Sequence, residues 1–190
     1  PVSVPSRADC GPDLAAVRAA ITPRTRAVLI NSPSNPTGYV WTRAEMAELV
    51  ELACRRDLWI VSDEIYRRLV FEGEPNPSPA EFGPEARART AVLDGASKTF
   101  AMTGYRIGFV AGPSELAAAV ERLHSHLTGC PNAISQEAFR AVLVEEPPEV
   151  ARMVAEFAAR RGYLLGALGA MGLETPYPRG AFYAFPRVSE

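Results

Sequence analysis

Side chains that could do chemistry gather in three separate segments of the sequence. The segments are N-S-P-S-N-P-T-G at residues 31–38, S-D-E-I-Y at 62–66 and D-G-A-S-K-T-F at 94–100, and Arg106 follows Lys98 by eight positions. The amine of Lys98 could form a Schiff base with an aldehyde. The carboxylate of Asp63 could hold a proton on a ring nitrogen, and Arg106 could bind a phosphate through two parallel hydrogen bonds.

Each of these segments follows a short apolar run that is typical of a buried strand. The runs lie at residues 27–30, 58–61 and 91–93. Continuous apolar runs of this length favour a parallel sheet that is covered on both faces. Ligands of open α/β sheets bind beyond the carboxyl ends of the strands, so we expect the three polar segments to meet at that edge.

The remaining pattern places helices and loops around these strands. Thr42 is expected to cap a helix over 43–56, with Glu45 in the capping-box position. The strand–helix–strand unit that results should be right-handed. The other expected elements are a proline-rich loop at 73–84, a strand at 106–111, helices at 114–127 (capped by Ser114), 134–145 and 149–168, and a strand at 180–186.

The composition is that of a globular chain, and it argues against two classes of partner. The 190 residues are 47% hydrophobic and 22% charged, with a net charge of −2. This balance leaves no basic footprint for nucleic acid and no polybasic face for a membrane. No apolar run approaches the roughly 20 residues that span a bilayer, so we expect neither nucleic acid nor membrane among the partners.

The cysteines and histidines predict no metal site. Cys10, Cys54 and Cys130 are widely spaced and follow neither a zinc-binding nor a disulfide pattern. So few cysteines favour a reducing, cytoplasmic setting. His124 and His126 lie two positions apart on a predicted helix and therefore point to different faces, which is a poor geometry for a metal ion.

Together, the polar segments supply what an aldehyde cofactor with a pyridine ring and a phosphate would need. Lys98 offers the amine for a Schiff base, and Asp63 can keep the ring nitrogen protonated, so that the ring accepts electrons from a carbanion. The candidate donors to the phenolic oxygen of the ring are Asn35 and Tyr66. The candidates for binding the phosphate are Arg106 and Ser97.

Each of these residues alone has a simpler explanation. A lysine or aspartate at a strand end is usually a surface, turn or capping residue, and N-P-T-G by itself is a good turn sequence. The prediction depends on all of them appearing in order, each at a strand end. Phe182 and Tyr183 could touch a substrate side chain, but ordinary core packing is the simpler interpretation.

The motifs resemble those of the fold-type I pyridoxal-phosphate (PLP) aminotransferases of class I/II, the aspartate-aminotransferase type. The resemblance rests on S-P-S-N-P-T-G, S-D-E-I-Y and S-K-T-F-A-M-T-G-Y-R-I-G-F and extends from Thr22 to Gly180, as a partial chain. It implies a covalent PLP lysine that also shuttles a proton, a carboxylate on the pyridine nitrogen, two donors to the phenolate oxygen and a phosphate-binding arginine. These roles fall on Lys98, Asp63, Asn35 with Tyr66, and Arg106, respectively.

Three further details follow from the resemblance. It implies a cis peptide bond before Pro36. The tryptophan that the family has in M-T-G-W-R is replaced by Tyr105. Gly95 stands where several relatives have a serine, so Ser97 is expected to take the phosphate role of that serine.

The resemblance also implies the fold and the domain organisation. The expected fold class is α/β, a three-layer α/β/α arrangement with a mostly parallel sheet. Residues 1–148 would form part of the large PLP-binding domain. Residues 149–190 would form a linking helix and the truncated start of a smaller C-terminal α+β domain.

The function implied is amino-group transfer between an amino acid and a 2-oxo acid by a homodimer. The same scaffold supports other PLP chemistry, such as C–S β-lyase activity, and aminotransferase-like domains also serve as sensors in transcription regulators. Family members run to about twice this length, so the chain by itself could also be inactive. The cofactor motifs do not separate amino transfer from other PLP chemistry, whereas nothing basic in the chain supports the sensor.

Overall fold

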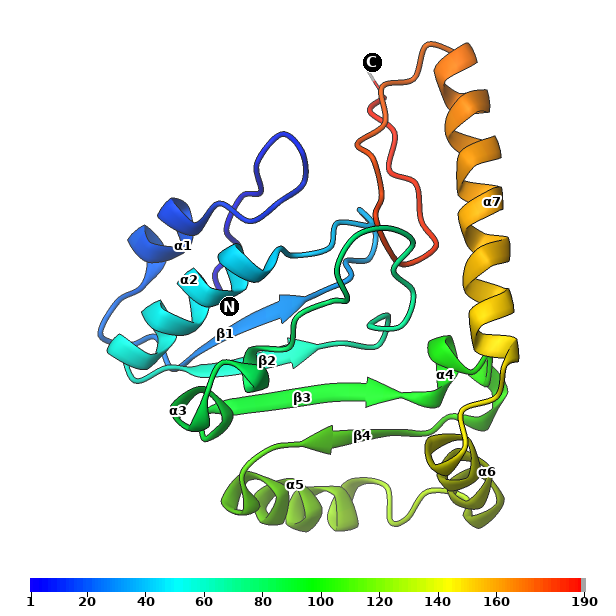
Figure 1. Ribbon diagram of the computed structural model, residues 1–190. Coiled ribbons are helices and arrows are strands. Elements are labelled where there is room, and N and C mark those ends of the chain that lie inside the picture. Colours follow the sequence, from blue (N-terminus) through cyan, green and yellow to red (C-terminus); the bar gives the residue numbers. More distant parts are fainter. Residues whose placement is uncertain (189–190) are drawn as a thin grey trace.

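The computed structural model describes residues 1–188 and contains one mixed four-stranded sheet with helices around it (Figure 1). The strand order is β1-β2-β3-β4, which follows the order in the sequence. Strands β1 (Ala27–Asn31), β2 (Trp59–Asp63) and β3 (Thr90–Gly95) are parallel, and β4 (Gly108–Ala111) is antiparallel to β3. The mostly parallel sheet agrees with the predicted α/β class.

Helices α1 (Leu14–Ala20) and α2 (Arg43–Arg55) cover one face of β1 and β2. Burial of apolar area drives this contact, and the core that it forms contains Leu14, Ile30, Met46, Leu49, Val50, Ala53, Leu58, Ile60 and Ala86. On the opposite face of β1, Leu29 is 72% exposed. Within the described residues, therefore, this face of β1 is open at Leu29.

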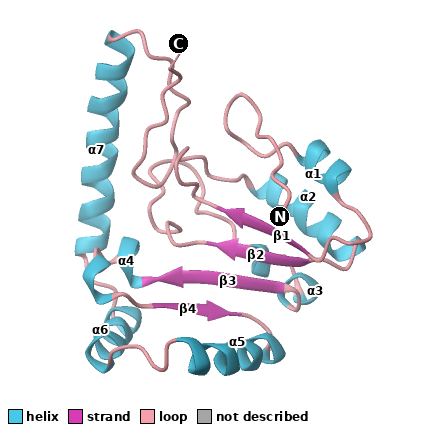
Figure 2. Ribbon diagram, turned by 180° about the vertical axis from the view of Figure 1, so that it is seen from behind, coloured by secondary structure: helices cyan, strands magenta, loops and turns pink. Residues whose placement is uncertain are grey.

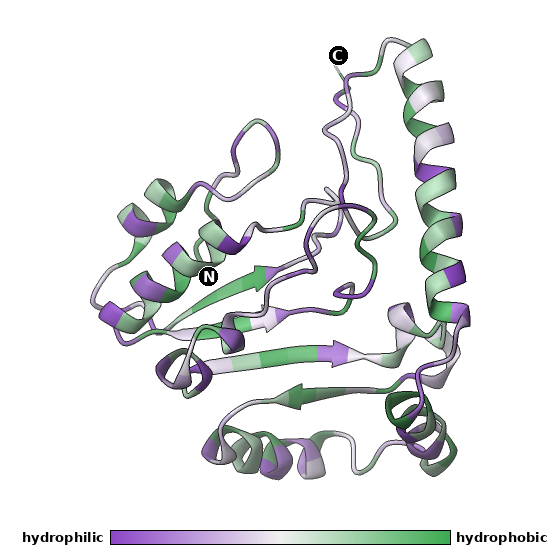
Figure 3. Cartoon of the chain, in the orientation of Figure 1, coloured by the Kyte–Doolittle hydropathy of each residue, from purple (hydrophilic) through white to green (hydrophobic). Residues whose placement is uncertain are grey.

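The polar ends of the strands lie where the sequence predicts them. Figure 3 shows apolar strand interiors with polar residues at the carboxyl ends of β1 and β3. Helix α7 (Glu149–Ala170) stands beside this edge, and the C-terminal segment runs back between α7 and the sheet (Figures 1 and 2). Met153, Val154 and Phe157 of α7 pack against Tyr66 and Leu69, which follow β2.

The shorter elements correct several details of the predictions. Helix α5 (Ser114–Leu127) is capped by Pro113, so Ser114 is its first residue and makes no capping bond. The predicted strand over 180–186 is wrong, because only Gly180 forms a bridge, with Val70. The remaining elements are η1 (Pro79–Glu81), α3 (Pro84–Arg87), α4 (Ala96–Thr99), η2 (Thr103–Tyr105) and α6 (Ala133–Val144).

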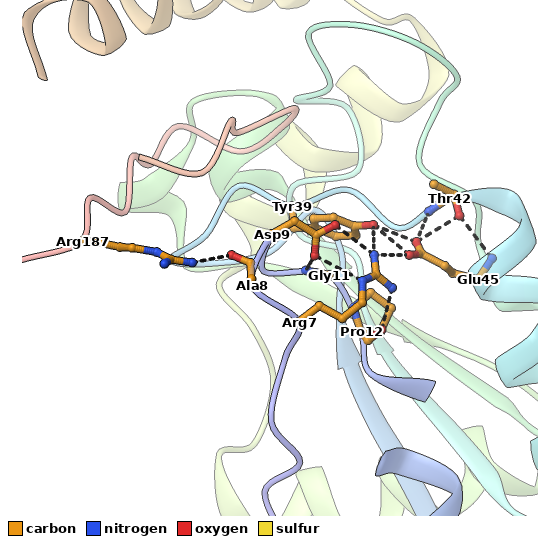
Figure 4. Close-up of polar contacts among 9 residues, drawn as sticks. All are labelled: Arg7, Ala8, Asp9, Gly11, Pro12, Tyr39, Thr42, Glu45 and Arg187. Atoms are coloured by element: carbon orange, nitrogen blue, oxygen red, sulfur yellow. Dashed lines mark hydrogen bonds and ion pairs between the residues drawn. The ribbon is translucent and has the colours of Figure 1, made fainter. Parts of the chain in front are cut away.

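The capping box of α2 is confirmed, and it is part of a larger polar cluster (Figure 4). Thr42 accepts from the Glu45 amide at 3.2 Å, and Glu45 Oε2 accepts from the Thr42 amide at 2.9 Å. Glu45 also accepts from Arg7 Nη2 and from the Tyr39 hydroxyl, both at 2.8 Å. Burial alone would raise the pKa of Glu45, but these bonds outweigh it and lower the pKa. The cluster thereby fixes the N-terminal segment and the end of the N-P-T-G turn to α2.

Replacing Glu45 with alanine is expected to destabilise the fold by about 1–2 kcal/mol at neutral pH, because the cap and its ion pair are lost together. The pKa of Glu45 is lower in the folded state than in the unfolded state, where it is about 4.3. The stabilisation that ionised Glu45 provides is therefore fully present above the unfolded-state pKa, and it is lost as the pH falls through the folded-state pKa. Urea unfolding at several pH values measures this. Glu48→Ala, on the same helix and half exposed, should change stability far less; equal losses would contradict the assignment.

No helix within residues 1–188 is long and apolar enough to cross a membrane.

Candidate functional site

The carboxyl ends of β1 and β2 meet as predicted. Asn31 and Asp63 lie opposite each other in the sheet register. The Asn31 side chain donates to the Asp63 carbonyl at 3.1 Å and accepts from the Asn35 amide at 2.8 Å. The peptide bond before Pro36 is cis, as predicted, and so is the bond between Ser32 and Pro33. Asn31 therefore ties the loop that carries Asn35 to the strand end that carries Asp63.

Asp63 is half buried, and it has a second carboxyl group nearby. Its Oδ1 accepts from the Ile65 amide at 3.2 Å, which orients the side chain. Asp94, at the end of β3, accepts from the Gly95 amide at 2.7 Å. Burial raises the pKa of Asp94, and the negative charge of Asp63 adds to the shift. Asp94 is thus held toward its protonated form beside Asp63.

A buried polar group anchors the segment behind Asp63. Glu64 is 1% exposed, and its Oε1 accepts from the hydroxyls of Ser62 at 2.9 Å and Ser78 at 2.7 Å. Burial raises its pKa. Ser78 comes from the proline-rich segment that was predicted as a loop and that contains η1. Through these two bonds, Glu64 ties the proline-rich segment at Ser78 to the end of β2 at Ser62.

Lys98 and Tyr66 come together at this edge. Lys98 lies in the single-turn helix α4, directly after β3, so the polar segment that follows this strand is helical at the lysine. Its Nζ is 5.8 Å from the ring centroid of Tyr66 and 5.7 Å from that of Phe182. An ammonium group at this distance from aromatic rings is attracted to them. The amine thus lies beside two aromatic side chains, and the residue Tyr66 is only 3% exposed.

Tyr66 keeps its proton and has a partner that the sequence did not reveal. Its hydroxyl oxygen lies 2.5 Å from that of Tyr183. Burial, together with the negative charge of Asp63, raises the pKa of Tyr66 well above its usual value, while an interaction with Asn35 acts in the opposite direction. Tyr66 is thus a hydroxyl donor across the whole physiological pH range, with Asn35 and Asp63 as neighbours.

The segment that carries Tyr183 is fixed by backbone bonds to both neighbouring loops. The amides of Arg179 and Gly180 donate to the Gly38 carbonyl at 2.9 Å, and the Ala181 amide donates to the Leu69 carbonyl at 2.8 Å. A Cβ on Gly180 would lie 2.7 Å from that Leu69 oxygen, so only glycine allows this approach. The G-A-F-Y sequence is therefore placed against the site rather than in a strand.

Arg106 and Ser97 are less firmly placed. Arg106 adopts a left-handed conformation after η2 and lines an open pocket of about 480 Å³, together with Gly104, Tyr105, Asn132, Ile134 and Ser135. The carbonyl of the next residue, Ile107, accepts from the Ala96 amide at 3.2 Å. This bond brings the backbone beside Arg106 close to the start of α4. Within residues 1–188, Arg106 forms no ion pair and the Ser97 hydroxyl forms no hydrogen bond. Both groups are available to an anion.

The structure explains why Gly95 replaces a serine. A Cβ at this position would lie 2.8 Å from the Ile107 carbonyl oxygen and 3.0 Å from the Gly108 Cα. These are backbone atoms of the first residue of β4 and of the residue before it, so they cannot move aside cheaply. The close pairing of β3 with β4 thus requires glycine here.

Gly95→Ser should accordingly destabilise the fold by about 1–3 kcal/mol, which is the usual range for an overpacked position. Thermal or urea unfolding measures the loss. The matched control is Gly104→Ser, because a Cβ there meets nothing within 4 Å, and its effect should stay within about 0.5 kcal/mol. A fully stable Gly95→Ser protein would show that β4 can shift away.

Taken together, the site offers an amine, a carboxylate, a phenol hydroxyl and an amide side chain at one edge of the sheet, with an unpaired guanidinium nearby. Within the described part of the chain, no cluster of three His, Cys, Asp or Glu side chains could hold a metal ion. The donor set therefore suits an organic ligand that has a carbonyl group, a basic nitrogen and an anionic group.

Comparison with known proteins identifies the family. The family model described as aminotransferase class I and II matches residues 1–190. The chain is 42% identical to an aspartate aminotransferase of Geobacillus stearothermophilus and 44% identical to an aspartate/prephenate aminotransferase of Thermus thermophilus, over 92% and 94% of its length, respectively. These matches cover 44% and 46% of the relatives, so the chain spans about half their length.

The solved structures agree with this result. An aromatic aminotransferase from Pyrococcus horikoshii OT3 superimposes with a TM-score of 0.94 at 35% identity, over 99% of this chain and 51% of that one. The predicted fold class, the α/β/α large domain with a mostly parallel sheet, is thereby confirmed. The chain belongs to the class I and II aminotransferase family.

Proposed function

We propose that the whole protein is a PLP-dependent aminotransferase that moves an amino group between an amino acid and a 2-oxo acid. The observation that carries the proposal is the convergence of Lys98 and Tyr66 with the loop ends that hold Asn35 and Asp63, in a chain of this family. The relatives are named for aspartate, prephenate and aromatic amino acids. Their names support amino acids and 2-oxo acids as the substrate classes.

The residues of the site fit PLP. Lys98, the only lysine among the 190 residues, offers the amine. Asp63 offers a carboxylate whose charge is felt at Tyr66 and at Asp94. Arg106 is exposed and forms no ion pair in the described part of the chain, and its Nη1 donates to the Thr103 carbonyl. Its guanidinium is therefore better suited to binding a phosphate than to a structural role. Ser97 is the further candidate for that phosphate.

When bound, PLP supplies an aldehyde that bonds to primary amines and a ring that draws electrons from the substrate α-carbon. Asp63 would hold the proton on the ring nitrogen, because an opposite charge favours the protonated form. Tyr66 and Asn35 would donate to the phenolic oxygen. The amine of Lys98, once free, would take the proton from the α-carbon of the amino acid and deliver it to the carbon of the cofactor's aldehyde group.

The domain organisation and assembly follow from the same proposal. Residues 1–148 would belong to the large PLP-binding domain, and 149–190 to the linking helix and the start of the small domain. Residues 189–190 lie outside the described part. A homodimer is supported by the apolar side chains on α5 and α6, where Leu127, Ile134 and Val144 are 70–75% exposed. The three free thiols support a reducing, cytoplasmic compartment.

The experiment is to supply the whole protein with PLP, an amino acid such as aspartate and 2-oxoglutarate, and to measure both products. Equal amounts of the new oxo acid and the new amino acid are expected. Release of pyruvate and ammonia from a cysteine conjugate, with no amino transfer from any amino acid, would identify a lyase instead. PLP binding without turnover of either substrate type would favour a sensor.

A further inference from the structure

Tyr183 reaches the site through its hydroxyl group. The oxygens of Tyr183 and Tyr66 lie 2.5 Å apart, and their rings meet edge to face, with centroids 5.7 Å apart. A phenol hydroxyl has one hydrogen and two lone pairs. Because a single hydrogen occupies the space between the two oxygens, the other hydroxyl must point its hydrogen elsewhere.

The direction of this bond decides what Tyr66 can do. When Tyr66 donates to Tyr183, Tyr66 has no hydrogen left for a ligand. When Tyr183 donates to Tyr66, the hydrogen of Tyr66 is free to point toward the side where Asn35 and Asp63 lie. The second arrangement also strengthens Tyr66 as a donor, because linked hydrogen bonds polarise one another.

We propose that Tyr183 is a positioning residue that donates to Tyr66 and so directs the Tyr66 hydroxyl toward the phenolic oxygen of the cofactor. The proposal rests on the proposed function, since that function supplies the acceptor. Tyr183 itself touches neither substrate nor cofactor in this role.

Packing holds Tyr183 in place for this task. The hydrogen bond from the Ala181 amide to the Leu69 carbonyl lies two residues before Tyr183. The ring of Phe182 stacks on Phe157 of α7 at 5.2 Å and meets Tyr66 edge to face at 5.4 Å. Tyr183 is therefore fixed to the loop after β2, the loop that also carries Tyr66.

The charged groups around the pair come from three elements. Asp63 ends β2, and its charge opposes ionisation of Tyr66, with neutral Asn35 beside it. The amine of Lys98 on α4 lies 5.8 Å from the Tyr66 ring, and Arg160 and Arg161 of α7 line a pocket with Tyr183. Burial raises the pKa of Tyr66 most. A hydroxyl that donates to Tyr66 stabilises its phenolate, so removing the Tyr183 hydroxyl should raise the pKa of Tyr66 further.

The first test uses the cofactor-free protein. The pKa of Tyr66 is measured by NMR with tyrosine labelled at the carbon that bears the hydroxyl, and its signal is assigned with Tyr66→Phe. Tyr183→Phe should raise that pKa, because the donor to the Tyr66 oxygen is lost, and it should leave the fold intact, since the ring is kept. The control is Tyr163→Phe on α7, whose side chain is 83% exposed. An unchanged or lowered pKa of Tyr66 in Tyr183→Phe would overturn the proposal.

The second test uses the protein loaded with PLP and follows its visible absorption band with pH. Donation from Tyr66 stabilises the phenolic oxygen without its proton, so Tyr66→Phe should raise the apparent pKa of the band. Tyr183→Phe should raise it in the same direction by about half to one pH unit, the size expected for one weakened hydrogen bond. Once Tyr66 is phenylalanine, adding Tyr183→Phe should shift it no further.

The outcomes separate this role from the proposed function. A shift with Tyr66→Phe but none with Tyr183→Phe overturns the role of Tyr183 and leaves the proposed function standing. A protein that does not attach PLP at Lys98 overturns the proposed function and, with it, the cofactor part of this role. In that case the cofactor-free titration still reports whether the two hydroxyls are coupled.

Discussion

Lys98→Ala is expected to abolish covalent attachment of PLP and to lower the amino-transfer rate by at least about 10²–10⁴-fold, the range that a positioned general base contributes. The chain offers no second lysine side chain for either task, because Lys98 is its only lysine. Its Nζ also lies beside Tyr66 and Phe182, where no other basic side chain of the described residues is found within reach of both rings. Single-turnover kinetics with PLP and an amino acid measure the loss.

Two further variants make this result specific. Lys98→Arg keeps the positive charge but cannot bond to the aldehyde, so it should be as inactive as Lys98→Ala. A small primary amine added to Lys98→Ala should restore part of the rate, because it can carry the missing proton. Arg140→Ala, an exposed pair with Glu137 on α6, is the control and should keep the parent rate. Transfer by Lys98→Ala at the parent rate would refute the assignment.

Asp63→Asn is expected to lower the rate by about 10²–10³-fold, the usual cost of losing one electrostatic contact in a site, while PLP still attaches to Lys98. Asparagine has the same shape, and its oxygen can still accept from the Ile65 amide at 3.2 Å. The change thus removes the charge and spares the loop. Without that charge, nothing in the assigned set holds the ring nitrogen protonated.

Comparison of kcat and covalent attachment in the same protein checks this prediction. Attachment should persist at the parent stoichiometry, and kcat should fall. Asp57→Asn is the matched control, since Asp57 is almost fully exposed and pairs only with Arg89 among the described residues. An Asp63→Asn protein with the parent kcat would show that the carboxylate does not face the ring nitrogen.

Much of the fold and part of the site could be predicted from local rules. The capping box of Thr42 and Glu45 needs only two residues three positions apart, and it was found with the expected bonds. The three parallel strands were recognisable because their apolar runs are short and uninterrupted. The residues that follow them converge because parallel strands end at one edge.

Other features depend on contacts that no local pattern contains. The run at 180–186 is apolar and aromatic, as strands often are, but the close approach of Gly180 to Leu69 fixes it as an irregular segment. The pairing of Tyr183 with Tyr66 joins positions 117 apart, so neither spacing nor periodicity could have indicated it. Pro113, which cannot donate a backbone hydrogen bond, takes the capping position that Ser114 was expected to fill.

The location of the covalent bond to PLP tests the account most directly. The whole protein is loaded with PLP, reduced with borohydride and digested with trypsin, and the peptides are identified by mass spectrometry. Because trypsin does not cleave after a modified lysine, we expect one peptide spanning Thr90 to Arg106 that carries the cofactor at Lys98. Cofactor on any other amine, with the peptide Thr90 to Lys98 recovered unmodified, would contradict the site described.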